Sequence, residues 1–388
     1  MRLMQLEELA EVNPRLPKKS FDADHLVSFV PMAAVSEMSK SIVQTESRPY
    51  GEVSKGYTYF DNGDLIVAKI TPCYENGKMA IVEGLAHSPA FGSTEFHVIR
   101  PGKKLLGRFL FHLLQSPAVR VAGKSRMKGA AGQKRVPTDF FKELKIPCPP
   151  IPEQKRIAAI LDAADALRAK RRETLAQLDT LLQSTFLEMF GDSASTPETP
   201  TETIENLVIE IIDYRGKSPV KTTSGIPLIT AKLIKGKEVG TPNEFIAESA
   251  YETWMRRGIP KPKDVIITTE APMGEVALVP DYKAAFAQRL LVLQPNAKIV
   301  RSTYLLWALT MPFVNHQLLR RSTGSTVTGI RSKEFKQIRL PLPPIETQFR
   351  FEKIAQSVEQ QKSRLRTHLD ELDTLFASMQ TRAFAGEL

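Results

Sequence analysis

The chain has 388 residues, of which 42% are hydrophobic and 25% are charged. This composition is typical of a globular protein with two or three domains, and it excludes a largely disordered chain. The formal net charge of +10 and the pI of about 9.4 indicate a polyanionic partner.

The two cysteines, Cys73 and Cys148, match no disulfide framework and no zinc-binding spacing. We therefore expect them to be reduced and half-buried. The sequence has no signal peptide and no apolar run near the length that crosses a bilayer. A cytoplasmic protein is the resulting expectation.

Residues 1–145 form the first predicted domain, which we call the first lobe. Apolar, β-branched runs bounded by Gly, Pro and Asp are typical of strands, and the apolar run at 108–114 is typical of a short buried helix. The predicted strands lie in "GDLIVAKITP" (63–72), "GKMAIV" (77–82) and "FHVIRP" (96–101). The lobe should therefore be a mixed α/β domain.

A proline-rich turn and a long helix follow at 146–192. The turn "IPCPPIPEQ" (Ile146–Gln154) ends regular hydrogen bonding and fixes an extended backbone. Neither Pro nor Gly occurs from Glu153 to Phe190, and Gly191 then provides a helix stop. Such a helix would be roughly 57 Å long at 1.5 Å per residue.

The second half of the chain repeats this plan. A polar, Pro-containing linker leads into the second lobe, residues 193–339. Another turn, "LPLPPIETQ" (Leu340–Gln348), opens the segment 340–388, in which Pro and Gly are again absent from Glu346 to Phe384. The second lobe's predicted elements are "KDVIITTEAP" (263–272), "GEVALV" (274–279), "LLVLQP" (290–295) and "TYLLWAL" (303–309). The two turns lie 194 positions apart in one register, which indicates an internal duplication.

Both long helices carry a stripe with the 3.5-residue spacing of a coiled coil. The first predicted stripe is Ile160, Ala164, Leu167, Arg171, Thr174, Leu178, Leu181 and Thr185. The second is Ile354, Val358, Gln361, Leu365, His368, Leu372, Leu375 and Met379. Because each stripe needs an apolar partner, we expect the two helices to pack on each other. The alternative is that each helix packs on its own domain.

The excess positive charge lies in the two lobes. In each lobe one long stretch, 96–138 and 282–333, is rich in Lys and Arg and has no acidic residue. Each stretch contains a loop of glycines, small polar residues and cations: "SRMKGAAGQKR" (125–135) and "RRSTGSTVTGIR" (320–331). Glycines let the backbone approach a phosphate, whose oxygens then accept hydrogen bonds from N–H groups, hydroxyls and cations. One charge run is usually a solvated face, but its recurrence in both lobes favours nucleic acid.

The candidate DNA-binding residues come from these two loops and from a third basic turn, "YRGKSP" (214–219), which would supply donors to base edges. A purely structural turn is the alternative for the third. The candidates are Lys124, Arg126, Lys128, Gln133, Lys134, Arg135, Tyr214, Arg215, Lys217, Arg320, Arg321, Thr323, Ser325, Thr326 and Arg331.

Motifs for catalysis are missing. Neither "GKS" triplet has the upstream glycine of a phosphate-binding P-loop, and no "NPPY"-like, GxGxxG or paired-histidine pattern occurs. Glu143 and Glu334 lie in triplets that resemble nuclease carboxylate–lysine pairs. Both precede a proline cluster without an obvious metal-binding Asp upstream, so we interpret them as structural. We predict no catalytic residue, metal or cofactor on this chain.

The two proline turns and several lobe stretches, among them "ITPCYENGKMAIV" and "TTEAPMGEVALV", resemble the specificity subunits of type I restriction–modification enzymes. Thr347 departs from the pattern, because Glu is commoner there. The resemblance implies an α+β fold: two mixed α/β target recognition domains separated by two long antiparallel helices, a coiled-coil spacer, in a pseudo-twofold internal repeat.

The resemblance also implies a non-enzymatic subunit that reads a bipartite, asymmetric target in double-stranded DNA. The helix pair would set the gap between the half-sites. Two methyltransferase subunits and the restriction subunits would be its partners, and these would use S-adenosylmethionine, ATP and Mg²⁺. The methyltransferase is expected to dock on the long helices and their turns. Alternatives are a subunit of a methyltransferase-only or other phage-defence complex, a two-lobed scaffold for acidic proteins, and a nuclease that uses Glu143 or Glu334.

Overall fold

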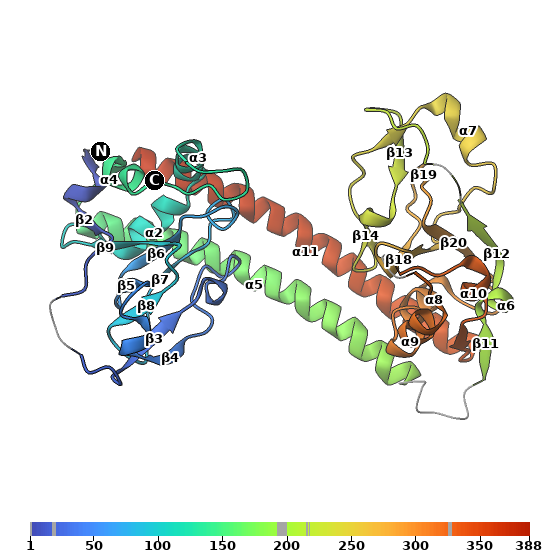
Figure 1. The fold of residues 1–388 in the computed structure, drawn as a ribbon. Coiled ribbons are helices and arrows are strands. Elements are labelled where there is room, and N and C mark those ends of the chain that lie inside the picture. The colour runs from blue at the N-terminus through green and yellow to red at the C-terminus, as the bar shows by residue number, and fades with distance from the viewer. Residues whose placement is uncertain (1, 18–20, 192–199, 215, 217, 325–327) are drawn as a thin grey trace. The chain divides into compact units, whose positions relative to one another are not determined.

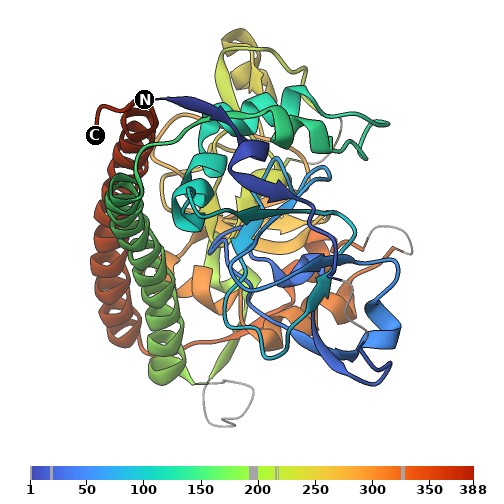
Figure 2. The same ribbon diagram turned by 90° about the vertical axis from the view of Figure 1, so that its left-hand side faces the viewer.

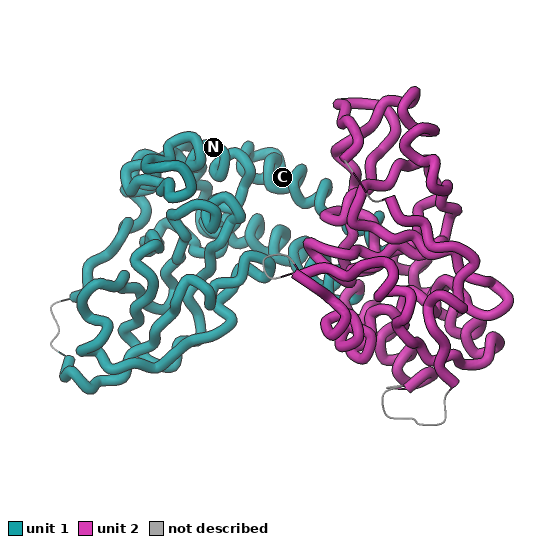
Figure 3. The backbone as a smooth tube through the Cα atoms, turned by 45° about the vertical axis from the view of Figure 1, so that its right-hand side comes forward, with its two compact units in different colours: residues 1–174, 365–388 teal, residues 175–364 magenta. Residues whose placement is uncertain are grey.

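The computed structural model describes residues 2–17, 21–191, 200–214, 216, 218–324 and 328–388. The chain forms two compact units (Figure 3). Unit 1 comprises Met1–Thr174 and Leu365–Leu388, and unit 2 comprises Leu175–Arg364. Each unit therefore contains one lobe and one half of each long helix, whereas the predicted domain boundaries treat the helices as separate segments.

Unit 1 contains short strands and short helices around the first lobe (Figure 1). Its strands are β1 (Leu3–Gln5), β2 (Ala10–Val12), β3 (Leu26–Val30), β4 (Glu46–Pro49), β5 (Thr58–Phe60), β6 (Leu65–Ala68), β7 (Met79–Ile81), β8 (Ala90–Gly92), β9 (Phe96–Pro101) and β10 (Lys145–Pro147). Its short helices are η1 (Leu6–Glu8), η2 (Met32–Ala34), α1 (Tyr50–Val53), α2 (Gly107–Gln115), α3 (Pro117–Ser125) and α4 (Thr138–Glu143).

Unit 2 contains the second lobe. Its strands are β11 (Thr201–Thr203), β12 (Val208–Asp213), β13 (Ile226–Ile229), β14 (Ile234–Lys235), β15 (Glu238–Val239), β16 (Phe245–Ile246), β17 (Val265–Thr269), β18 (Met273–Leu278), β19 (Ala285–Phe286), β20 (Leu290–Pro295) and β21 (Arg339–Pro341). Its short helices are α6 (Ile204–Leu207), η3 (Ala231–Leu233), η4 (Glu248–Ala250), α7 (Tyr251–Trp254), α8 (Ser302–Ala308), α9 (Pro312–Arg321) and α10 (Ser332–Lys336).

The two lobes share one sheet plan, which confirms the predicted duplication. The first antiparallel sheet has the order β2-β9-β6-β7 in unit 1 and β12-β20-β17-β18 in unit 2. A second sheet contains a parallel pair in each lobe, β3 with β8 and β13 with β19. All the lobe strands and helices expected from the sequence are present, and each predicted pair occupies matching positions in the two orders.

The central strand of each first sheet alternates between two cores, as a strand buried on both faces must. Leu65 and Val67 of β6 pack with α2 and the long helices, whereas Ile66 faces the second sheet. Val265 and Ile267 of β17 do the same in unit 2, and Ile266 faces the other way. One face of each lobe is therefore closed by the helix pair.

The two long helices are α5 (Ile151–Phe190) and α11 (Ile345–Ala385), and they lie side by side in each unit (Figure 2). Each begins directly after a proline pair, slightly earlier than expected. Each is followed by glycine in the left-handed region, Gly191 with φ 70° and Gly386 with φ 86°, which confirms the predicted stops. The alternative that each helix packs only on its own domain is wrong, because the halves of α5 pack in different cores.

On α11 the predicted stripe is right at every second position and one residue early at the others, whereas on α5 it is wrong only at Leu167 and Leu181. Val358, Leu365, Leu372 and Met379 face inward on α11, and so do Ala164, Arg171, Leu178 and Thr185 on α5. Leu167, Leu181, Ile354 and Leu375, by contrast, are 58%, 48%, 39% and 53% exposed. The residues that follow them, Arg168, Leu182, Ala355 and Phe376, face inward instead.

At two of these places, next to Leu167 and next to Gln361, the inward residue is charged. Arg168 of α5 bonds Asp373 of α11 at 2.5 Å, and its guanidinium lies over the Phe376 ring. In unit 2, Lys362 of α11 bonds Asp179 of α5 at 2.7 Å, and its side chain is only 6% exposed. A prediction from hydrophobicity places Arg and Lys on the exposed face of a helix, because the sequence pattern carries no information about a pairing carboxylate on the opposite helix.

A buried glutamine fixes the start of α5. The Gln154 Oε1 atom accepts a hydrogen bond from the Leu106 N–H at 2.7 Å. Its Nε2 group donates to the carbonyl oxygens of Lys104 and Pro149, both at 2.8 Å. One side chain therefore joins the long helix, the proline turn before it and the loop that leads into α2.

Gln348 repeats this arrangement in unit 2. It accepts from the Arg301 N–H at 2.8 Å and donates to the carbonyl oxygens of Pro343 at 2.9 Å and Ile299 at 3.2 Å. Both glutamines are fully buried. This shared network explains why a glutamine closes both proline-rich turns.

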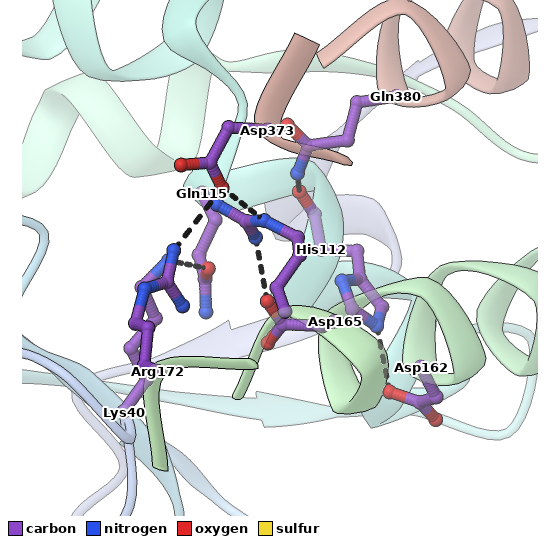
Figure 4. A network of polar contacts seen from close by, with 9 residues as sticks. Lys40, His112, Gln115, Asp162, Asp165, Arg172, Asp373 and Gln380 are labelled. Atoms are coloured by element: carbon purple, nitrogen blue, oxygen red, sulfur yellow. Dashed lines mark hydrogen bonds and ion pairs between the residues drawn. The ribbon is translucent and has the colours of Figure 1, made fainter. Parts of the chain in front are cut away.

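In unit 1, a lysine from the lobe reaches the helix pair (Figure 4). Lys40 has a left-handed backbone, with φ 51°, and donates a hydrogen bond to the Gln115 side-chain oxygen. The pKa of Lys40 is lowered to about 8, chiefly by burial, while nearby Asp165 raises it and Arg168 lowers it. Beside it, His112 bonds Asp162 at 2.7 Å, and the Gln380 amide donates to the His112 carbonyl.

Unit 2 has a corresponding lysine. Lys237, with φ 68°, lies in the turn between β14 and β15, and its Nζ atom sits 4.2 Å from the Trp307 ring centroid. Burial lowers its pKa, while Asp179 of α5 raises it. Each lobe therefore places a lysine, at the tip of a turn, within the electrostatic influence of a carboxylate of α5.

Among the described residues, no helix combines the length and the apolar character needed to cross a membrane.

Replacing Gln154 with leucine should lower the free energy of unfolding of unit 1 by about 3 kcal/mol, because three buried backbone groups lose their partner. The midpoint of denaturant unfolding measures the change. Lys155→Leu, at the exposed neighbouring position, is the control and should shift stability by less than about 0.5 kcal/mol. Equal midpoints for the two variants would show that the glutamine network is dispensable.

Candidate nucleic-acid interface

The first cationic loop forms a hairpin anchored on the sheet of unit 1. Lys128 and Arg135 exchange backbone hydrogen bonds of 2.8 and 2.9 Å across its base. The Thr71 N–H donates to the Lys134 carbonyl, which ties the hairpin to the turn after β6. Gly129, with φ 127°, closes the hairpin where a Cβ atom would lie 2.8 Å from the Gln133 carbonyl oxygen. Lys128, Gln133 and Lys134 are exposed on it.

Several cations of this loop pair with acids from elsewhere in the chain. Lys124 bonds Glu75 at 2.9 Å and Arg126 bonds Glu143 at 3.5 Å. Arg135 makes a bidentate pair with Glu95, and these hydrogen bonds lower the pKa of the Glu95 carboxyl. The stretch 96–138 contains no acidic residue, yet carboxylates from other parts of the fold neutralise part of its positive charge. Lys128 and Lys134 form no ion pair within the described part of the chain.

The second cationic loop is anchored in the same way in unit 2. Thr323 and Gly329 exchange hydrogen bonds of 2.9 and 3.0 Å, and the Ile330 N–H donates to the Thr269 carbonyl. Arg320, Thr323 and Arg331 are exposed. Arg321 lies 3.6 Å from Glu334. Ser325 and Thr326 lie outside the described residues.

The third candidate, the basic turn after β12, is different. Tyr214 is only 2% exposed, stacks on Phe286, and donates its hydroxyl to the Gly258 carbonyl at 2.5 Å. Burial raises its pKa. Tyr214 is therefore a core residue, and the prediction that it contacts DNA is wrong because its polar group is already satisfied. Arg215 and Lys217 lie outside the described residues.

A hollow beside the second loop brings the candidate Arg331 together with residues that the sequence did not single out. It is lined by Asp213, Glu270, Gln288, Arg289, Ile330 and Arg331. Glu270 and Arg289 form an ion pair of 2.7 Å, and Gln288 donates to the Ser218 hydroxyl at 2.6 Å. Gln288 and Arg289 lie directly before the predicted strand 290–295 in an acid-free stretch. That position is the feature of the sequence that could have identified them as candidate DNA-binding residues.

Glu143 and Glu334, the residues of the nuclease alternative, lie at the surface. They belong to the short helices α4 and α10, each of which ends just before the strand that leads into a proline cluster. Each pairs with an arginine of the neighbouring loop. Among the described residues, no three His, Cys, Asp or Glu side chains gather closely enough to hold a metal ion. Cys73 and Cys148 are free and half-buried, as predicted.

The sequence matches the family model described as the type I restriction modification DNA specificity domain over residues 1–178 and 215–372. The chain belongs to this family. Its α+β fold, with two duplicated lobes and two long antiparallel helices, agrees with the fold that the resemblance implied.

Known members of the specificity-domain family are similar over different shares of the chain. The specificity subunit of the type I restriction enzyme EcoAI from Escherichia coli is 38% identical over 200 residues, which are 50% of this chain and 33% of that protein. The match thus spans about a third of that relative's length. The EcoBI specificity subunit of E. coli is 20% identical over 417 residues, 99% of this chain and 85% of that protein.

The fold is also similar to a chain in a solved structure that concerns complex assembly and conformational transition of a type I R-M system. The TM-score is 0.60 at 22% identity, with 100% of this chain and 98% of the other covered. At this identity the likeness concerns the fold alone.

Removing two loop cations, as in Lys128→Ala with Lys134→Ala or Arg320→Ala with Arg321→Ala, should weaken binding to every duplex alike. If each cation contacts one phosphate, the slope of log K against log[salt] should become shallower by about 2. Gel shifts at several salt concentrations measure this. Lys155→Ala with Lys170→Ala, two exposed lysines of α5, is the matched control. A slope unchanged in both loop variants would remove the loops from the interface.

Proposed function

We propose that this chain is the DNA-reading specificity subunit of a type I restriction–modification complex. The observation that supports this most strongly is the pair of cationic loops, each anchored at the corresponding end of an inner strand, β6 or β17, of a duplicated sheet. Two such loops, one in each unit, suit a double-stranded target with two half-sites. Because the lobes differ in their loop residues, the half-sites should differ in sequence.

The chain would carry no catalytic group of its own. In this proposal two methyltransferase subunits and the restriction subunits supply the chemistry in the cytoplasm. S-adenosylmethionine, ATP and Mg²⁺ would bind to those partners. A subunit of a methylation-only or other phage-defence complex is the nearest alternative, and a neighbouring reading frame for an ATP-dependent nuclease separates the two.

The long helices offer a surface for the methyltransferase. Leu167 and Leu375 are 58% and 53% exposed in unit 1, and Leu181 and Ile354 are 48% and 39% exposed in unit 2. Unit 2 also exposes Leu187 of α5 at 39% and Phe349 of α11 at 45%, so both long helices present large apolar side chains in each unit. Several exposed apolar side chains on one pair of helices suit a partner better than solvent.

The proposal is tested by co-expressing the chain with its neighbouring methyltransferase and mapping methylated bases across the genome. We expect one asymmetric motif with two short specific parts and a gap of constant length. A scaffold for acidic proteins would instead give no methylated motif and no salt-dependent shift of duplex DNA.

Changing Leu167 and Leu375 together to serine should reduce co-purification of the methyltransferase about tenfold or more, because each buried leucine contributes roughly 1.5–3 kcal/mol to an interface. Duplex binding by the isolated chain should stay the same. Met38→Ser with Val121→Ser, two exposed apolar residues of the first lobe, is the control. Full recovery of the methyltransferase with the leucine variant would place its docking surface elsewhere.

A further inference from the structure

The residues just before β9 in unit 1 and β20 in unit 2 occupy the same place in the sheet but have opposite charge. In unit 1 this residue is Glu95, whose carbonyl accepts from the Lys69 N–H at 2.8 Å. In unit 2 it is Arg289, whose carbonyl accepts from the Thr269 N–H at 2.9 Å. The matching backbone bonds show that Glu95 and Arg289 are structural equivalents.

Each of these residues is held in an ion pair, but the two partners come from opposite sides of the matching bridges. Glu95 accepts a bidentate pair of hydrogen bonds from Arg135, at the base of the first cationic loop. Arg289 donates through Nε to Glu270 at 2.7 Å, beside the base of the second loop. Glu270 forms a β-bridge with Gly329, and in unit 1 the corresponding bridge joins Ile70 to Arg135.

Arg289 has an unusual backbone. Its φ is 78°, in the left-handed region that disfavours residues other than glycine. Such strain persists where the surrounding structure enforces it, and it occurs often at functional sites. Here the hydrogen bond from Thr269 and the pair with Glu270 hold the residue at the end of a sheet strand.

The surroundings of Arg289 suit recognition of a base. Its side chain is 48% exposed and lines the hollow together with Gln288 and Arg331. A guanidinium held in one orientation by a carboxylate is the group that pairs with O6 and N7 of guanine. Arg320, in contrast, lies at the end of a helix and leads into the cationic loop, where phosphate contacts are expected.

We propose that Arg289, oriented by Glu270, is a specificity-determining residue of unit 2 that reads a guanine. Because Glu95 replaces it at the same place in unit 1, the two units read different bases there. This inference rests on the proposed function, that is, on DNA reading by both units.

The test uses the full complex, with the chain co-expressed with its methyltransferase and methylated motifs mapped genome-wide. For the Arg289→Gln variant, the preference for guanine over the other bases should fall roughly ten- to a hundredfold at one position of one half-site. The other half-site and the gap should stay unchanged. Glu270→Gln should relax the same position less, because the arginine remains but is no longer oriented.

Two further variants keep the inference falsifiable. Arg289→Lys retains the positive charge and a long side chain but lacks the two parallel N–H donors of the guanidinium. It should therefore also reduce discrimination at the guanine position. Arg320→Ala should lower methylation of all sites alike and leave the motif intact. If Arg289→Gln and Arg289→Lys lower methylation uniformly with an unchanged motif, Arg289 is not a base reader, although DNA reading stands. If the unaltered complex yields no bipartite motif, the proposed function itself fails.

Discussion

The structure depends on a side-chain amide at the start of each long helix. Proline-rich turns cannot supply all the hydrogen bonds that buried backbone requires. Gln154 and Gln348 each satisfy three backbone groups, two in the loop that leads into a short helix (α2 or α8) and one in the proline-rich turn. The direction in which each long helix leaves its lobe is therefore fixed by a hydrogen-bond network as well as by apolar packing.

In both units, part of the positive charge is neutralised by ion pairs within the unit. The lobes carry the positive excess, but many cations are paired within their own unit, such as Arg100 with Asp64 and Arg301 with Glu352. Pairing orients these side chains and reduces the field that they project. The cations that remain exposed near the loop hairpins, such as Lys128, Lys134 and Arg320, then define a more local interface than the sequence suggested.

The repeat, the strands, the proline turns and the two helices could all be predicted, because each leaves a local pattern in the sequence. The helix stripe was predicted only in part, since Arg168 and Lys362 face inward on account of carboxylates far away in the chain. The loops were located correctly, but Tyr214 was misassigned, because burial depends on Phe286 and Gly258, which are distant in sequence. The left-handed backbone of Arg289 has no sequence signal of its own, because it arises from contacts across the sheet.

The composition of unit 1 has a consequence for biosynthesis. Its core includes Phe376 and Ala383, which follow all of unit 2 in the chain. At a translation rate of about 5–20 residues per second, the ribosome needs roughly ten to forty seconds to pass from residue 174 to the end of the printed sequence. During this interval the apolar face around Ile157 and Leu161 lacks its cover. The nascent first lobe should therefore be a substrate for chaperones until synthesis of the second helix is complete.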